Sequence, residues 1–243
     1  MTAAAWRERW DAQQELYLPD REERFEVIVD IVESVAGAQP RVIDLACGPA
    51  SLSRRLLSRL SSAQVVGVDA DPVLLALAGA DAPPGLALVD ADLRDPAWPD
   101  RLPAGPYDAI VSTTALHWLT EPELGNLYRA CWNLLRPGGV LADGDHLRSA
   151  GTPQLLELAL DLDERRAARK GTEAEDWGTW WTAVQAAPEF SSAVAERNRR
   201  TIEHPENSET SREVHERALR AAGFAEVGVL WQKGTDAVLA AIR

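Results

Sequence analysis

Short apolar runs alternate with helical patterns over roughly the first 146 residues, and this alternation is the main signal in the sequence. The first run, residues 41–45, ends in small turn-forming residues, and a helical pattern opens at Leu52. Runs of this length bounded by turn residues are typical of buried parallel strands. The pattern predicts an α/β protein with strands at residues 41–45, 64–69, 86–90, 107–113 and 140–143.

Helical spacing of apolar residues predicts two helices before the first strand. Residues 4–16 place Trp6 and Trp10 near one face, and Asp20 is a candidate cap for a second helix that Gly37 ends. Later helices are expected at 73–79, where Asp71 caps and Pro72 takes the first position, and at 121–135. Residues 136–139 (Arg-Pro-Gly-Gly) predict a turn into the fifth strand.

Residues 147–212 interrupt the alternation with a leucine-rich helix and with Trp177, Trp180 and Trp181 at helical spacing. These tryptophans either anchor a helical cap or line an apolar pocket. After this insertion the sequence predicts a helix at 213–222 and two strands at 223–231 and 235–243. The turn between these two strands is short enough for a hairpin, so the last strand is expected to be antiparallel. No repeat or linker divides the chain, so we expect one domain over residues 1–243, with N-terminal helices in 1–40 and a helical insertion at 147–212.

Composition and net charge exclude several classes of partner and cellular location. A hydrophobic fraction of 46% and a charged fraction of 26% are ordinary for a soluble protein. The net charge of -13 without any basic run argues against nucleic-acid partners. No apolar segment is long enough for a membrane span or a signal peptide, so a cytoplasmic location without membrane partners is expected.

The cysteines and the first turn bear on the chemistry. Cys47 and Cys131 lie far apart with no Cys/His cluster, so neither a disulfide nor a metal site is expected, and Cys47 is a small turn filler rather than a nucleophile. Small residues at 46–50, between a strand and a helix, expose backbone N–H groups at the carboxyl edge of the sheet. This stretch predicts a nucleotide-like cofactor pocket.

Acidic residues follow the next two strands. Asp69, at the end of the second strand, can accept hydrogen bonds from ribose hydroxyls or serve as a helix cap, and Asp71 is already available for capping. Asp92 can accept from an adenine amine while Leu93 packs on the ring, or it can simply form a turn. Near the N-terminus, Tyr17, Arg21 and Arg24 can reach a cofactor carboxylate, or they form a solvated helix face with a packed Tyr.

Taken together, these motifs resemble those of the class I S-adenosylmethionine-dependent methyltransferases, in particular their small-molecule branch. The resemblance rests on residues 42–50, on Val66-Gly-Val-Asp69, on Asp90-Ala-Asp-Leu93, on 107–118 and on 135–141. Gly48 is the only glycine of residues 48–53, which does not fit the Gly-x-Gly-x-x-Gly pattern of dinucleotide dehydrogenases. The resemblance implies a Rossmann-like, seven-stranded, mostly parallel sheet with an antiparallel terminal strand, helices on both faces and a helical cap insertion.

The resemblance also implies site residues for S-adenosylmethionine. Asp44, Ala46 and Gly48 would border the methionine moiety, although the family often has glycine at Ala46 and Ala50. Asp69 would bind the ribose, and Thr113 and Trp118 would close the far side. The adenine would lie against Ala70, Asp92 and Leu93.

The implied reaction is methyl transfer to a small-molecule acceptor, at oxygen rather than nitrogen or carbon. Protein or tRNA methylation is the alternative, as is a regulatory subunit that binds S-adenosylmethionine without turnover. His117 and His146 follow strands four and five and are the candidate general bases, although packing beside Trp118 is the favoured interpretation for His117. His204 and His215 are expected at the surface. The sequence identifies neither the acceptor nor the oligomeric state.

Overall fold

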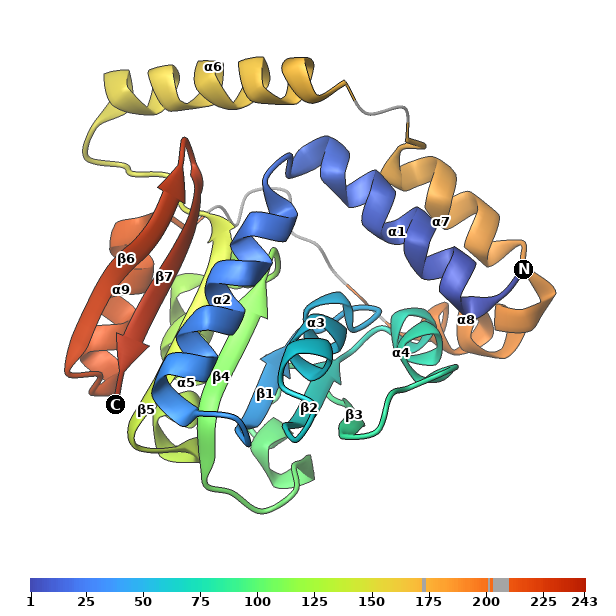
Figure 1. Cartoon of the computed structure of the whole chain (residues 1–243), viewed down its shortest axis with the longest axis horizontal. Helices are drawn as coiled ribbons and strands as arrows, with labels where there is room; N and C mark the ends of the chain where they lie inside the picture. The colour runs from blue at the N-terminus through green and yellow to red at the C-terminus, as the bar shows by residue number, and fades with distance from the viewer. Residues whose placement is uncertain (172–173, 201, 203–209) are drawn as a thin grey trace.

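A seven-stranded sheet forms the centre of the protein, which is described here from a computed structural model covering residues 1–171, 174–200, 202 and 210–243. The strand order is β3-β2-β1-β4-β5-β7-β6 (Figure 1). Pairing is parallel from β3 through β5, whereas β7 is antiparallel to both β5 and β6. The strands are β1 (Arg41–Leu45), β2 (Gln64–Asp69), β3 (Leu86–Asp90), β4 (Tyr107–Thr113), β5 (Leu135–His146), β6 (Glu226–Lys233) and β7 (Asp236–Ile242). The expected mostly parallel, Rossmann-like sheet with an antiparallel last strand is confirmed.

Alternate residues of the strands enter two separate cores, one on each face of the sheet. Val42 packs with Phe25 of α2 (Arg21–Ala36) and with α3 (Ser51–Arg59). Its neighbour Ile43 packs on the opposite face, in the core shared with α5 (Glu121–Leu134) and α9 (Arg212–Ala222). Because both faces of the sheet are covered, successive residues of the central strands are mostly apolar, which explains the continuous apolar runs.

The fifth strand is longer than the sequence indicates. The structure assigns residues 135–146 to β5, so the predicted turn at Arg136–Gly139 is an irregularity within a strand. Leu135 pairs with Tyr107 and Val140 with Ala109, so four residues bulge out between the two pairs. Gly138, at φ 72°, supplies the left-handed backbone that this bulge requires.

Two predicted helix caps differ in outcome. The Asp71 carboxylate accepts hydrogen bonds from the backbone N–H groups of Val73 and Leu74, so the cap of α4 (Pro72–Gly79) is confirmed. Asp20 precedes α2 as expected, but its side chain makes no capping bond. Its carboxylate instead pairs with Arg166 and Lys233, each at 3.1 Å, because two cations outcompete a backbone N–H for it.

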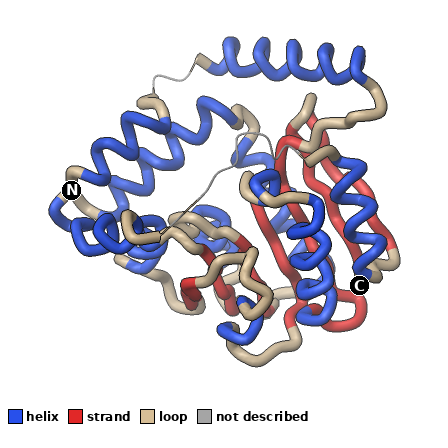
Figure 2. Tube along the Cα trace, turned by 180° about the vertical axis from the view of Figure 1, so that it is seen from behind, coloured by secondary structure: helices blue, strands red, loops and turns tan. Residues whose placement is uncertain are grey.

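The remaining helices form a layer at one end of the sheet. A third core joins α1 (Ala3–Tyr17) to α4, α7 (Trp177–Gln185) and the 3-10 turn η3 (Pro188–Phe190), and α8 (Ser191–Arg197) packs beside it. Trp6, Trp180 and Phe190 meet edge to face there. Helix α6 (Pro153–Lys170) contains no buried residue and lies beyond the turn between β6 and β7, where its Asp163 accepts from the Thr235 backbone N–H at 3.0 Å (Figures 1 and 2). Within the described residues, no helix is long and apolar enough to cross a membrane.

Candidate active site

A cavity of about 680 Å³ lies at the carboxyl ends of β1, β2, β4 and β5, under α1 and α7. All of the site residues predicted from the sequence line this cavity except Arg24 and Asp44. The ones that do are Tyr17, Ala46, Gly48, Asp69, Ala70, Asp92, Leu93, Thr113, His117, Trp118 and His146. Residues distant in the sequence thus converge on one concave site.

The turn after β1 has a left-handed backbone at three positions, Ala46 (φ 50°), Gly48 (φ 55°) and Ala50 (φ 64°). Such angles cost an alanine about 1 kcal/mol or more, and they allow a tight turn into α3. A Cβ atom added at Gly48 would meet only the Leu74 side chain, at 3.9 Å, so the backbone there is open. Cys47 is buried, and burial raises the pKa of its thiol well above the ordinary value, which fits a turn filler and not a nucleophile.

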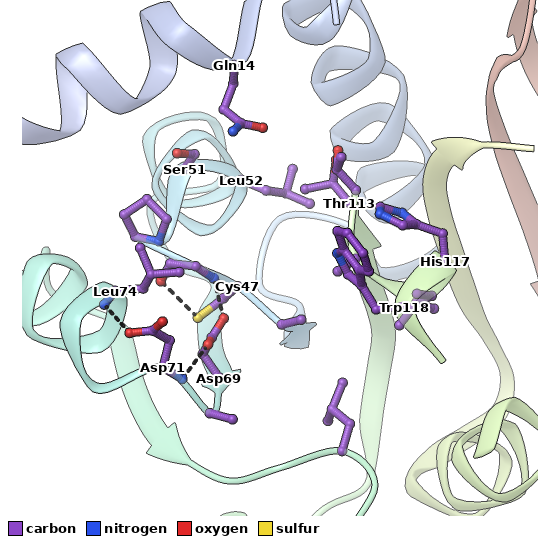
Figure 3. A pocket seen from close by; sticks show the side chains of 18 of the residues that line it. Gln14, Cys47, Ser51, Leu52, Asp69, Asp71, Leu74, Thr113, His117 and Trp118 are labelled. Carbon is purple, nitrogen blue, oxygen red and sulfur yellow. Dashed lines mark hydrogen bonds between the residues drawn. The ribbon is translucent and has the colours of Figure 1, made fainter. Parts of the chain in front are cut away.

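Asp69 is anchored to this turn. One carboxylate oxygen accepts from the backbone N–H of Gly48 at 2.7 Å and the other from that of Asp71 at 2.8 Å (Figure 3). Burial raises the pKa of Asp69 to about 6, although both backbone hydrogen bonds oppose this shift. Each oxygen keeps a lone pair, so the carboxylate can still accept from a ligand hydroxyl.

Asp92 and Leu93 lie past the end of β3 and line the same cavity as Ala70 and Ile202. The Asp92 carboxylate accepts from the backbone N–H of Arg94 at 2.9 Å, so Asp92 does form a turn. Its side chain is 49% exposed and keeps a second oxygen available. The turn role and a ligand role are therefore compatible.

Arg24 and Asp44 lie beneath the cavity and do not line it. The Arg24 guanidinium is fully buried and donates to Asp236 at 2.9 Å and to Thr113 at 2.8 Å. Asp44 is equally buried and accepts from the Ser53 hydroxyl at 2.6 Å, and burial raises its pKa to about 7. Both side chains thus support the cavity floor. Arg21, by contrast, lines the cavity, and its guanidinium donates to Asp11 at 2.8 Å.

On the wall opposite Asp69, His117 and Trp118 belong to the 3-10 turn η2 (Leu116–Trp118) after β4 (Figure 3). The Nδ1 atom of His117 lies 2.9 and 2.8 Å from the two carboxylate oxygens of Asp145, which is completely buried in β5. The other histidine, His146, places its Nδ1 3.1 Å from the Thr235 hydroxyl, and burial lowers its pKa. Of the two, only His117 has a carboxylate partner among the contacts described.

The sequence interpretation missed Asp145. It ended the fifth strand at residue 143, whereas the strand continues to His146 and brings Asp145 beside His117. The sequence signal that could have identified Asp145 is the run Asp143-Gly-Asp-His146 at the end of an apolar strand. Charged residues at the carboxyl end of a parallel strand lie at the edge of the sheet where ligands bind.

His215 is buried, so its predicted surface position is wrong; His204 lies outside the described residues. The Nδ1 atom of His215 is 2.7 Å from the Tyr128 hydroxyl and its Nε2 2.8 Å from that of Thr210. Burial lowers the pKa of His215 to about 4. The ring faces inward because residues 215, 218 and 219 share one face of α9.

Aromatic side chains of α1 and α7 roof the cavity. Trp10 and Trp181 lie over the β2 side, because Trp181 belongs to the core with α4 and carries the Arg197 guanidinium 4.4 Å above its ring. Tyr17 and Trp177 lie next to each other, with the Trp177 backbone N–H 3.3 Å from the Tyr17 hydroxyl. Both roles considered for the tryptophans in the sequence analysis therefore occur. Trp180 anchors the helical layer, and Trp177 and Trp181 line the pocket.

Residues 42–139 match the family described as a methyltransferase domain. Among curated proteins, the chain is 38% identical over 134 residues to a trans-aconitate 2-methyltransferase of Azoarcus sp. (strain BH72), covering 55% of this chain and 49% of that protein. It is 28% identical over 192 residues to a trans-aconitate 2-methyltransferase of Yersinia pestis (strain Pestoides F), covering 78% and 64%. The chain thus spans about half the length of the first curated relatives it matches.

Solved structures share the fold at low sequence identity. One is an amino pentose methyltransferase from Micromonospora echinaspora with S-adenosylmethionine bound, at a TM-score of 0.55 and 18% identity, covering 91% of this chain and 90% of that one. Another is human N-acetylserotonin methyltransferase in complex with the same compound, at a TM-score of 0.54 and 16% identity, covering 99% and 58%.

Proposed function

We propose that the chain is a class I S-adenosylmethionine-dependent methyltransferase, as its similarity to the methyltransferase domain over residues 42–139 supports, and that it transfers a methyl group to an oxygen atom of a small-molecule acceptor. The observation that carries the proposal is the meeting of an Asp69–Gly48 ligand cradle and a His117–Asp145 pair in one cavity. The relatives named trans-aconitate 2-methyltransferase also act on a small molecule, as their name states.

The donor set of the cradle fits S-adenosylmethionine. The Asp69 carboxylate can accept from the two ribose hydroxyls, and the open backbone at Gly48 admits a ligand chain without a steric conflict. The N-terminus of α3 and the Arg21 guanidinium suit a carboxylate. Leu93 and Asp92 suit an adenine ring and its amine. When bound, this cofactor supplies an activated methyl group on a sulfonium.

His117 is suited to act as the general base. Since the ionised Asp145 carboxylate only accepts, it holds the proton of His117 on Nδ1, so that Nε2 is the ring nitrogen that carries the basic lone pair. That nitrogen can take the proton of an acceptor hydroxyl, a contribution worth about 10²- to 10⁴-fold in rate. The roof of α1 and α7 limits water access to the same site.

We propose a single domain over residues 1–243 in which the insertion at 147–212 caps the cavity. Arg197 donates to Asp71 at 2.6 Å, and Arg200 forms two 2.7 Å bonds with Asp90 and one of 3.0 Å with the Ala70 carbonyl. These bonds tie the insertion to the ends of β2 and β3. A roofed cavity in a chain of net charge -13 favours small molecules over tRNA or protein acceptors.

Measuring turnover distinguishes a methyltransferase from a regulatory subunit that only binds S-adenosylmethionine. The purified chain is incubated with S-adenosylmethionine and pools of small phenols, alcohols and carboxylic acids, and S-adenosylhomocysteine is quantified. We expect acceptor-dependent product from the wild type and at least a tenfold loss with Asp69→Asn. Cofactor binding without product in any pool would favour the regulatory alternative.

A further inference from the structure

The cavity has two halves that the strand order separates. Gly48, Asp69 and Asp92 lie at or just beyond the ends of β1, β2 and β3, whereas His117 and His146 lie at or just beyond the ends of β4 and β5. In the sheet, β4 and β5 lie on the opposite side of β1 from β2 and β3. If the first half holds the cofactor, as proposed above, the methyl acceptor lies in the second, beside the two histidines.

The β6–β7 hairpin turn holds His146 by its Nδ1 atom. This atom lies 3.1 Å from the hydroxyl oxygen of Thr235, which is buried and is not among the described residues that line the cavity. The Thr235 hydroxyl donates its single proton to the Asp163 carboxylate of α6 at 2.6 Å. Because a carboxylate only accepts and this bond is the shorter one, Thr235 accepts from the Nδ1–H group of His146. Nε2 is therefore the nitrogen that carries the lone pair of the neutral ring.

Asp163 is fixed against the same turn. The oxygen that accepts from the Thr235 hydroxyl also accepts from the Thr235 backbone N–H at 3.0 Å, and the other oxygen accepts from Arg166 at 2.7 Å. A Cβ atom at Gly234 would lie 1.8 Å from the Asp163 carboxylate, so only glycine lets α6 approach the turn this closely. The hairpin turn is thus shaped to receive Asp163, although none of the described residues that line the cavity belongs to α6.

The other edge of the His146 ring is available to a ligand. The ring lines the cavity, and within the part of the chain that the structure describes its Nε2 atom has no hydrogen-bond partner and is not sealed from the cavity. Burial lowers the pKa of His146, and the charge of Arg24 adds to this effect. The carboxylates of Asp145, Asp236 and Asp163 oppose it. The uncharged ring can accept a hydrogen bond from a hydroxyl or N–H group.

The two histidines are suited to different roles. Nδ1 of His117 faces the buried Asp145 carboxylate, which stabilises positive charge on that ring when it takes up a proton. Nδ1 of His146 faces a neutral hydroxyl, so a proton on its Nε2 gains no such support from its direct partner. His117 thus fits proton uptake, and His146 fits orientation of the substrate by a hydrogen bond.

We infer that His146 binds a hydroxyl or N–H group of the methyl acceptor through Nε2, and that Asp163 of α6 positions this ring through Thr235. This inference rests on the proposed function and deepens it. It gives α6 a part in substrate recognition that requires no contact between α6 and the substrate.

Nitrogen NMR of the full chain, with isotope-labelled histidine, reads the tautomer of His146 directly. In the wild type we expect Nδ1 to carry the proton. Thr235→Val removes the hydroxyl and Asp163→Ala frees its proton for Nδ1, so both variants should shift the ring toward the Nε2–H tautomer. Asp161→Ala is the matched control on the same helix and should leave the tautomer unchanged, because the Asp161 carboxylate is 49% exposed and pairs with Arg165 at 2.7 Å.

Diethyl pyrocarbonate tests the cavity side of the ring, because it acylates a neutral imidazole at an accessible lone pair. His215 is the internal reference, since its two ring nitrogens lie 2.7 and 2.8 Å from the hydroxyls of Tyr128 and Thr210. By peptide mass spectrometry at neutral pH, we expect His146 to react at least about tenfold faster than His215, whose modification requires local opening. For a methyl acceptor found in the pooled assay, Thr235→Val should raise KM about three- to tenfold and leave kcat within about threefold.

The inference is overturned by a tautomer that stays unchanged in Thr235→Val or in Asp163→Ala, as expected if Asp163 only fastens α6 to the hairpin. A His146 ring that reacts no faster than His215 overturns it as well. Calorimetry with S-adenosylhomocysteine tests the proposed function separately. If this compound does not bind, the proposed function fails; if it binds and either of the two results above is obtained, only the roles of His146 and Asp163 fail.

Discussion

Asp145 holds the Nδ1 atom of His117 between its two carboxylate oxygens, at 2.8 and 2.9 Å, in a position that no solvent reaches. One of these oxygens also accepts from the backbone N–H of His146 at 2.7 Å. Burial opposes ionisation of Asp145, but His117 and the charge of Arg24 outweigh it and hold the pKa of Asp145 below its ordinary range. The carboxylate is therefore ionised at neutral pH and acts on catalysis through His117.

Asp145→Asn tests this positioning role. The amide lacks the charge that fixes the His117 tautomer, so we expect kcat to fall about 10²- to 10⁴-fold and the pH–rate profile to change shape. The affinity for S-adenosylhomocysteine should stay within a factor of about three. Steady-state kinetics and calorimetry provide the two readouts.

Asp143→Asn is the matched control on the same strand. Asp143 is fully buried, burial together with the charge of Asp145 raises its pKa, and neither of its carboxylate oxygens makes a hydrogen bond within the described part of the chain. An amide in its place should leave kcat within about twofold. Equal losses in the two variants would mean that the carboxylates serve only the fold.

Arg24→Met tests whether the buried guanidinium is structural. The variant leaves Asp236 without its ion-pair partner, so the free energy of unfolding in urea should fall by about 3–5 kcal/mol. Adding Asp236→Asn should restore part of that loss. Unchanged stability combined with a loss of cofactor affinity would instead support the carboxylate-binding role that the sequence suggested for Arg24.

His215 predicts a pH dependence of stability. Its pKa is about 4 in the folded chain, against about 6.5 when unfolded, so the unfolded state binds more protons between these values. Its contribution to stability is full above pH 6.5 and is lost as the pH falls toward 4. We therefore expect His215→Gln to lower the free energy of unfolding, relative to the wild type, by less at pH 4.5 than at pH 7.5. The two losses should differ by about 2–3 kcal/mol. Asp44 and Asp69, whose pKa values are raised, make stability fall as the pH rises. Both proteins contain these residues, so their effect cancels in the difference between the variant and the wild type. A pH-independent difference between them would contradict this account.

The sequence predicted the fold well where apolar runs are bounded by turn residues. Strands β1, β2 and β4 match the expected residues because each run ends at a small or polar residue. The start of β5 was wrong because Pro137 and the two following glycines read as a turn, yet they form a bulge that pairing with β4 and β7 tolerates. Local turn propensity cannot reveal that the neighbouring strands continue past it.

The resemblance to methyltransferases was also predicted, and residues 42–139 do match the family described as a methyltransferase domain. Site residues carried by motifs, such as Gly48 and Asp69, do line the cavity. Asp145, which contacts His117, and the roof residue Trp10 lie outside any motif, because only tertiary packing brings them to the site. The sequence analysis proposed Arg24 as a site residue because of its charge, but its guanidinium is buried against Asp236 beneath the cavity.

Calorimetric titration tests the central claim most directly. S-adenosylmethionine, S-adenosylhomocysteine and NAD are titrated into the wild type and Asp69→Asn. The account predicts micromolar binding of both sulfur compounds, no binding of NAD, and at least a tenfold loss of affinity in the variant because Asp69 would no longer accept from both ribose hydroxyls. Absence of binding by either sulfur compound, or equal affinity in the variant, would contradict it.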